Sequence, residues 1–422
     1  MKKYFKHLGF IFLCLTVLLL PFPRALPMWA MGLFLISGFY YWLTGFRKTY
    51  ESFKKDAFLF SGPILYFILH LIWIPFQNPP FSYYSSAFIF FLVPVLGYPI
   101  FSSSYFSNNL VNVVKVFIFG LLIICIFEYA RAFWNSISFQ GGIFTFNPDV
   151  DFNTAASSPD FISAKSRFRS FQLSFLEHPS YLSMKVLFAV CLIMEFRNEL
   201  KINKWILFLI TIVLIIYLYS LSTRAAFLTG LFLMIYYLLN LSFIRQRIWI
   251  LILVIPILLY SFFKVSMLNA RVREKTEEFI ANFDKKGNNL EKTDTRLLAW
   301  ISSAEMIKRR PLIGYGLRSR DALSAEYLKK GLDYEAKIKI NPHNQFLETQ
   351  LAFGIPGSVA LFLMLFTPLF KKPQGFRVRL YHTFVIILIT SLMFASLITG
   401  HWGTIFYSFF YCIIVFGKVE QN

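Results

Sequence analysis

Residues 341–366 read NPHNQFLETQLAFGIPGSVALFLMLF, a polar start followed by a long apolar run. Asparagine caps helices well, and proline is tolerated at the first helical position, where no N–H bond is lost. The stretch therefore predicts a membrane helix capped by Asn341, with Pro342 and His343 in its first turn. There the positive end of the helix dipole disfavours an imidazolium, which makes His343 a candidate neutral base near pH 7. The alternative is a histidine that lies at the membrane interface without a chemical role.

Apolar runs of similar length recur along almost the whole chain. Of 422 residues, 57% are hydrophobic and only 15% are charged, which is far from the composition of a soluble globular protein. Each run is close to the ~20 residues that a helix needs to cross a bilayer, so we predict an all-α polytopic membrane protein with about twelve transmembrane helices. The expected spans are 8–25, 27–45, 57–76, 83–104, 110–134, 180–197, 203–221, 224–243, 247–265, 344–370, 379–400 and 402–417.

The distribution of basic residues predicts the orientation of the chain. Short loops rich in lysine and arginine alternate with loops that nearly lack them, and the basic loops are expected in the cytoplasm. Both termini then lie in the cytoplasm, and the long loops 135–179 and 266–342 lie outside. The predicted parts are an N-terminal bundle of about nine spans (1–265), a helical loop domain (266–342) and about three C-terminal spans (343–422). The basic residues of the cytoplasmic loops are Arg47, Lys48, Lys54, Lys55, Arg197, Lys201, Lys204, Arg245, Arg247, Lys371, Lys372, Arg377 and Arg379.

The net charge of +20 is carried by short loops and by one long loop. This makes anionic lipid head groups and a phosphate-bearing substrate better partners than nucleic acid. The acidic residues are scattered, so no carboxylate cluster for a metal ion is predicted. The cysteines all fall in apolar runs and are expected as small core residues, not as disulfides or metal ligands. They are Cys14, Cys125, Cys191 and Cys412.

The loop 266–342 is too long to be a simple connection. Its pattern predicts a helix over 271–283, a stronger helix that begins at Asp294 or Thr295 and ends before Pro311, and a third helix over 319–330. We therefore expect a small helical cap that packs over the membrane domain. The apolar side of the stronger helix is expected to carry Leu297, Leu298, Trp300, Ile301 and Ala304.

Three polar features are expected on the outer face: Arg224, Arg296, and His343 with a glycine turn near it. Arg224 begins a span directly after a short outer loop, where a cation must either reach the interface or be paired. Arg296 begins the strongest cap helix, where the helix dipole opposes a positive charge unless an anion joins it. Gly314 and Gly316 flank Tyr315 in a turn that backbone or a ligand could approach closely. For each arginine, the alternative is a lipid-phosphate anchor or a salt bridge.

These features, in this order, resemble the O-antigen ligase superfamily of bacterial inner-membrane glycosyltransferases, which carry a long periplasmic loop before a late span. Residues 169–171 and 178–180 are similar to a further Arg-Gly-Phe…Asn-Pro-Asn region of the family but depart from it at the glycine and at both asparagines. The resemblance covers roughly residues 165–370. It rests on Arg224 at a span start, Arg296-Leu-Leu-Ala-Trp300, Gly314-Tyr-Gly316, Pro342-His343-Asn344-Gln-Phe-Leu-Glu348 and Gly354-Ile-Pro-Gly357.

The resemblance implies an enzyme that transfers a glycan from undecaprenyl diphosphate to an acceptor hydroxyl, expected on lipid A-core, at the periplasmic face of the inner membrane. Arg224 and Arg296 would bind the diphosphate through forked hydrogen bonds, and His343 would remove the hydroxyl proton. The arginines would neutralise the charge that a metal neutralises in other enzymes, so we expect neither metal nor cofactor. The expected partners are the glycan donor, the acceptor and membrane lipids. Supporting roles are implied for Arg169, Gly314, Gly316, Asn344 and Glu348.

Glu348 is a charged residue inside a predicted span. It lies five residues after His343, about 140° round a helix, so it is not the obvious partner to orient the imidazole. A carboxylate in such a span is expected to be either paired or functional.

Two other functions are compatible with the pattern. A polymerase of the same superfamily would join repeat units and would use the same donor chemistry on a different acceptor. A transporter would also have about twelve spans, but transporters usually carry related halves and polar groups near the midplane. Here the polar groups concentrate on one face, which favours an enzyme.

The predicted orientation can be tested with reporter fusions. Alkaline phosphatase fused after Lys286 should be active, because residues 266–342 are expected outside, and a fusion after Lys372 should be inactive. Reversed activities would place Arg224, Arg296 and His343 in the cytoplasm and contradict the predicted site.

Overall fold

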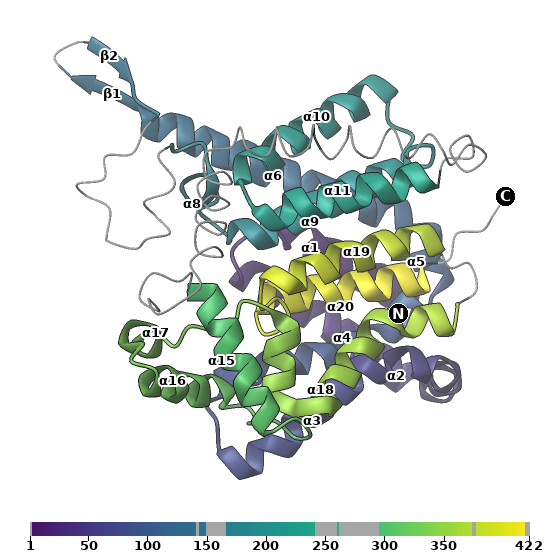
Figure 1. Cartoon of the computed structure of the whole chain (residues 1–422). Helices are drawn as coiled ribbons and strands as arrows, with labels where there is room; N and C mark the ends of the chain where they lie inside the picture. The colour runs from purple at the N-terminus through teal and green to yellow at the C-terminus, as the bar shows by residue number, and fades with distance from the viewer. Residues whose placement is uncertain are drawn as a thin grey trace. The chain divides into compact units, whose positions relative to one another are not determined.

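The computed structural model describes residues 2–140, 143–148, 166–240, 260, 295–373 and 377–417, and these are mostly helical (Figure 1). The prediction of a helical membrane protein is confirmed. Within these ranges one antiparallel hairpin interrupts the helices, formed by β1 (Ile137–Gln140) and β2 (Ile143–Phe146), with Ile137 paired to Phe146.

Every predicted span has a matching helix except 247–265, which lies outside the described residues apart from Tyr260. Among the described residues, five segments are long and apolar enough to cross a membrane: Ala25–Gln77, Leu110–Ser136, Pro179–Phe196, Lys204–Leu221 and Gln345–Phe370. The other apolar helices are shorter, so the total of about twelve spans stays a prediction. The matching helices are α1 (Lys2–Leu19), α2 (Ala25–Asp56), α3 (Ser61–Gln77), α4 (Ser85–Phe101), α6 (Leu110–Ser136), α9 (Pro179–Phe196), α10 (Lys204–Leu221), α11 (Arg224–Leu239), α18 (Gln345–Phe370), α19 (Val378–Phe394) and α20 (His401–Phe416).

Shorter elements connect these helices. They are η1 (Ala57–Phe60), η2 (Phe81–Tyr83), α5 (Ser104–Asn108), α8 (Ser170–Leu173) and the cap helices α15 (Thr295–Arg309), α16 (Ser319–Lys329) and α17 (Asp333–Lys337). The predicted cap helix over 271–283 lies outside the described residues.

The chain folds as two compact units. Unit 1 comprises Met1–Phe117, Gly287–Tyr381 and Leu392–Asn422, and unit 2 comprises Ile118–Lys286 and His382–Ser391. The division predicted at residues 265 and 342 concerns sides of a membrane, and it stays a prediction.

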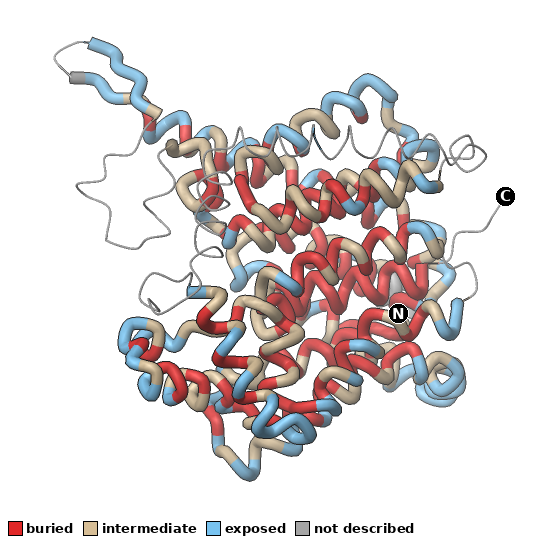
Figure 2. The backbone as a smooth tube through the Cα atoms, in the orientation of Figure 1, coloured by how far each residue is buried: buried red, intermediate tan, exposed pale blue. Residues whose placement is uncertain are grey.

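The centre of unit 1 is α20, which is buried from Gly403 to Phe416 (Figure 2). A helix that is apolar all round is typical of a fully enclosed position. Its tyrosine hydroxyls are paired: Tyr407 donates to the carbonyl of Met364 at 2.7 Å, and Tyr411 donates to the carbonyl of Leu59. Burial of these large rings therefore leaves no hydroxyl unsatisfied on them.

Unit 2 contains a fully buried ion pair. Lys185 Nζ in α9 donates to Glu177 Oε1 at 2.6 Å, and both side chains are 0% exposed. His178 then caps α9 by accepting a hydrogen bond from Ser180 N, with Pro179 at the first helical position. Removing one partner of such a pair leaves a buried charge at a cost of about 3–5 kcal/mol, so the pair holds the start of α9 in place.

Candidate functional site

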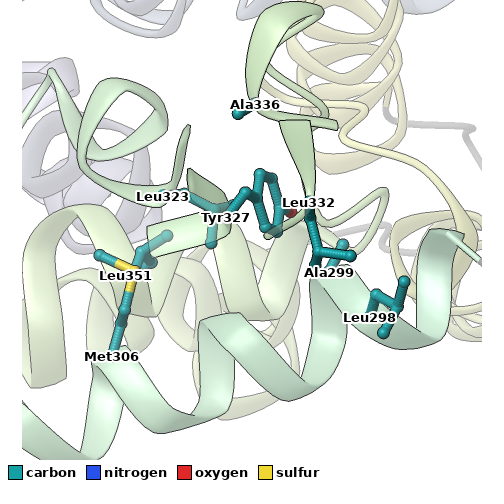
Figure 3. Close-up of a cluster of buried hydrophobic side chains, with 8 residues drawn as sticks. All are labelled: Leu298, Ala299, Met306, Leu323, Tyr327, Leu332, Ala336 and Leu351. Carbon is teal, nitrogen blue, oxygen red and sulfur yellow. The ribbon is translucent and has the colours of Figure 1, made fainter. Parts of the chain in front are cut away.

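The cap helices pack around a small hydrophobic core that also includes a side chain of α18. Figure 3 shows Tyr327 of α16 among buried side chains from α15, α17 and α18. Met306 of α15 and Leu351 of α18 belong to the same cluster, so the cap and the membrane helix share one core. This shared core fixes the positions of α15 and α16 relative to α18.

The buried face of α15 differs from the predicted one. Of the five residues predicted on the apolar side, the structure buries Leu298 alone, and Ile301 is 45% exposed. The buried residues are Leu298, Ala299, Ser302, Ser303 and Met306. The small residues at 299, 302 and 303 let neighbouring helices approach closely. A prediction based on large apolar residues misses that kind of packing.

Helix α18 is broken at Gly354, whose φ of 61° and ψ of −149° are not helical. Pro356 has no N–H and cannot bond to the carbonyl of Ala352, so Gly316 N donates to that oxygen instead, at 2.7 Å. The N–H of Ile355 turns to the carbonyl of Pro311, at 3.0 Å. Residues 311–316 thus supply the backbone partners that a proline and a glycine remove from the helix.

Glycine is required where these two backbones meet. A Cβ on Gly354 would lie 2.3 Å from the carbonyl oxygen of Leu312, and a Cβ on Gly314 would lie 2.6 Å from that of Ala352. A Cβ on Gly316 would lie 2.5 Å from the side chain of Gln77. The turn over 314–316 is therefore approached closely by backbone and by a side chain of α3, and its glycines shape the site by packing.

The start of α18 differs from the prediction. The helix begins at Gln345, and its N-cap is Asn344, whose Oδ1 accepts hydrogen bonds from the N–H groups of Phe346 and Leu347 at 3.0 and 3.2 Å. The prediction that Asn341 caps the helix, with Pro342 and His343 in its first turn, is wrong. Two asparagines compete here, and Asn344 satisfies two free N–H groups while Asn341 satisfies only one.

His343 lies in a tight turn just before the helix. Its φ is 47°, a left-handed conformation, and its N–H donates to Asn341 Oδ1 at 3.1 Å. That local hydrogen bond between the side chain of Asn341 and the backbone is typical of Asn turns. The imidazole is partly exposed and stands at the N-terminal end of α18.

Arg296 is brought to this turn by α15. Trp300 Nε1 donates to the carbonyl oxygen of Pro342 at 2.7 Å, which ties α15 to the residue before His343. Arg296 lies four residues before Trp300 and therefore on the same face of α15. Two predicted site residues, Arg296 and His343, thus belong to one corner of unit 1.

A polar cavity lies next to this corner, also within unit 1. Its volume is about 390 Å³, and its walls come from α3, η2, α16 and the first turns of α18. Arg320 donates from Nε and Nη2 to Glu348 Oε1 at 2.8 and 2.6 Å, and the Glu348 side chain is only 6% exposed. Glu348 is thus paired, one of the two outcomes expected for a charge in this position.

Arg320 is a residue that the sequence analysis missed. It lies 28 residues before Glu348, and only the shared core of the cap and α18 brings the two together. The one available signal was the presence of an unpaired carboxylate at the start of an apolar span, which calls for a cation somewhere in the adjoining loop.

A second ion pair lies near the cavity. Lys339, which lines it, donates to Asp321 Oδ1 at 2.7 Å, and this bond raises the pKa of Lys339. The charge of Lys339 is thereby offset by a carboxylate, as that of Arg320 is offset by Glu348. The hydroxyl of Tyr83 also approaches Asp321 Oδ1, at 3.5 Å.

Arg224 and Arg169 belong to unit 2. Arg224 is the first residue of α11, directly after Thr223, whose hydroxyl donates to Ser183 Oγ at 2.9 Å. Arg169 precedes α8 with an extended backbone. Arg224 belongs to unit 2 and Arg296 to unit 1, and their expected joint action stays a prediction.

Comparison with known proteins bears on the middle of the chain. Residues 206–362 match the family model of the O-antigen ligase. The resemblance to the O-antigen ligase superfamily is confirmed. The O-antigen ligase match runs from α10 into α18 and includes Arg224, Arg296 and His343. A search of curated proteins finds no match.

The backbone junction at Gly354 predicts a sharp effect on stability. Gly354→Ala should lower the melting temperature and the yield, because φ of 61° with ψ of −149° is open to glycine almost alone, at a cost of about 1–3 kcal/mol for other residues. Thermal unfolding in detergent, followed by tryptophan fluorescence, measures the change.

Gly230 offers the matched control, because it lies inside α11 with no heavy atom within 4 Å of an added Cβ. Gly230→Ala should leave stability equal or raise it by up to about 1 kcal/mol. Equal melting temperatures for the Gly354 variant and the wild type would show that the break in α18 does not require glycine at position 354.

Proposed function

We propose that this chain transfers a glycan from undecaprenyl diphosphate to an acceptor hydroxyl, on lipid A-core, at the periplasmic face of the bacterial inner membrane. One observation carries the proposal: the Trp300–Pro342 hydrogen bond sets the helix of Arg296 against the turn of His343. This hydrogen bond supports a site at the start of α18 in which Arg296 binds a phosphate and His343 is the base for a hydroxyl, both within the O-antigen ligase match.

The donor chemistry explains why a cation is needed. Outside the cytoplasm there is no nucleotide sugar, so the diphosphate on the lipid carrier must be the leaving group. The bond from the anomeric carbon to the phosphate oxygen breaks, and the acceptor oxygen forms the new bond to that carbon. Negative charge then develops on the diphosphate, and a guanidinium can bind two of its oxygens through a planar fork. Arg296 takes this role in unit 1, and Arg224 is the further candidate.

His343 takes the proton that the acceptor hydroxyl loses. The hydrogen bonds from His343 N to Asn341 Oδ1 and from Trp300 Nε1 to the carbonyl of Pro342 hold the backbone of the turn that carries the imidazole. The N-terminal end of α18 favours the neutral form, which is the form that accepts a proton. General base catalysis of this kind typically contributes 10²–10⁴-fold.

A polymerase is the second candidate, because the O-antigen ligase family match supports ligases and polymerases alike. Both would use the same donor and the same three side chains. They differ in the glycans of a deletion strain: long glycan left on the carrier lipid indicates a ligase, and acceptor lipid capped with single repeat units indicates a polymerase.

Substitution of His343 tests the base. His343→Gln keeps size and hydrogen bonding but cannot take up a proton, so transfer in purified membranes should fall by about 10²-fold or more. The variant should bind the lipid-linked donor as the wild type does. Transfer by the wild type should rise with pH, because the imidazole accepts a proton only after it has lost its own. His7→Gln, outside the family match, serves as the control. Transfer by the His343 variant at the wild-type rate would reduce this residue to a positioning group.

Substitution of the arginines tests the binding of diphosphate. Arg296→Lys and Arg224→Lys keep the charge but lose the fork, so both should lower transfer by at least about tenfold. Arg309→Lys is the matched control, because Arg309 ends the same helix and pairs with Glu326 in the cap. Normal rates in both lysine variants, at normal expression, would leave these arginines as lipid anchors or salt bridges.

A further inference from the structure

We propose that the cavity beside Arg320 and Glu348 binds a neutral sugar ring of the glycan donor or of the acceptor. This inference rests on the proposed function, since it names the substrate group that lies next to the reacting atoms. Donor and acceptor share this chemistry, and the experiment below separates them.

Size and position suit such a ligand. A volume of about 390 Å³ falls within the ~300–1,000 Å³ of small-molecule sites. Gln345 and Glu348, in the first turn of α18, line the cavity directly after the turn that carries His343. Helix α18 begins at Gln345, two positions after His343, and Glu348 lies in its first turn. A sugar in the cavity would therefore contact the first turn of α18, which directly follows the turn that carries His343.

The carboxylate of Glu348 offers the cavity a hydrogen-bond acceptor. Arg320 Nε and Nη2 both donate to Oε1, and Nη2 also donates to Thr399 Oγ1 at 3.3 Å, while Oε2 is buried and has no hydrogen-bond partner among the described residues. A buried carboxylate oxygen without a partner is costly, and in native structures it calls for an explanation. A hydroxyl that enters the cavity would supply the donor that Oε2 lacks.

The charges of the cavity favour a neutral ligand over an anion. Arg320 is offset by Glu348 and Lys339 by Asp321, so the lining carries little net charge. A free carboxylate oxygen would also repel a phosphate. The remaining lining offers what a sugar ring needs, hydroxyl and amide groups together with the apolar faces of aromatic rings. Examples are Ser319, Gln345, Thr399, Tyr66 and Phe353.

A purely structural role for the Arg320–Glu348 pair would be to tie the cap to α18. The chain offers a matched pair with that role alone: Arg309 donates to Glu326 within the cap, and neither residue lines the cavity. Glu348→Gln and Glu326→Gln each weaken one arginine–carboxylate pair. Only the first changes the cavity.

The experiment measures binding and transfer separately on the full-length protein in detergent. Calorimetric titration uses two probes, the oligosaccharide released from the lipid-linked donor and the oligosaccharide released from the acceptor glycolipid, with inorganic diphosphate as a third. We expect one oligosaccharide to bind the wild type, at least tenfold weaker binding to Glu348→Gln, and unchanged binding to Glu326→Gln. The oligosaccharide that binds identifies the donor or the acceptor as the source of the sugar.

A second pair of variants, at Ser82, distinguishes loss of the cavity from loss of the fold. Ser82 is exposed at the cavity wall, so Ser82→Trp should obstruct the cavity with the Arg320–Glu348 pair intact, whereas Ser82→Ala should not. Melting temperatures of both should match the wild type. Weaker oligosaccharide binding by the tryptophan variant, with normal binding by the alanine variant, supports the proposal.

The outcomes separate this proposal from the proposed function. If the wild type transfers glycan but Glu348→Gln and Ser82→Trp bind both oligosaccharides as the wild type does, the cavity is not a sugar site and the function stands. If the oligosaccharide binds as expected but the wild type transfers nothing, the sugar site stands and the function fails. Loss of diphosphate binding alone in Glu348→Gln, or no oligosaccharide binding to the wild type, overturns the sugar site.

Discussion

The site in unit 1 depends on the need to satisfy backbone groups where α18 is broken. A transmembrane helix normally meets this need internally, because hydrocarbon offers no hydrogen bonds. The break at Gly354 and the missing N–H of Pro356 leave carbonyl groups without their usual partners, and residues 311–316 provide new ones. The cap is thus joined to the membrane helix by backbone hydrogen bonds, and side chains then add the shared core around Tyr327.

This junction sets the positions of the chemical groups. Pro311 and Gly316 are hydrogen-bonded to α18. Helix α15 ends just before Pro311 and α16 begins just after Gly316, so the junction fixes the end of one helix and the start of the other. Helix α15 carries Arg296 and, through Trp300, holds the turn before His343. Helix α16 carries Arg320 to Glu348. A rigid scaffold with functional groups on its connecting turns is a common arrangement for catalytic sites.

Each unit contains an ion pair whose carboxylate is buried. Glu348 is bound by Arg320 in unit 1, and Glu177 is bound by Lys185 in unit 2. The pairs differ in exposure: Lys185 and Glu177 are fully buried, whereas the Arg320 side chain is 39% exposed and lines a cavity. A closed pair is best explained by structure. Both pairs leave one carboxylate oxygen without a partner among the described residues, but of the two only the Arg320–Glu348 pair faces a cavity that a ligand can enter.

The sequence by itself determined the fold class, most helix positions and the family resemblance. Long apolar runs, polar caps and glycine–proline punctuation act locally, so they can be read from neighbouring residues. The turn over 314–316 was visible in the same way, whereas the span 344–370 was predicted as continuous and its break at Gly354 was missed. The choice between Asn341 and Asn344 as the cap was not, because both are good caps and their hydrogen bonds decide between them.

Only the tertiary structure decided which distant groups meet. The pairing of Arg320 with Glu348, the bond from Trp300 to Pro342 and the buried face of α15 all join residues far apart in the chain or depend on close packing of small side chains. Such contacts leave no periodic signal in the sequence. They follow from the way α18 breaks and the cap packs against it, and this is a property of the folded unit as a whole.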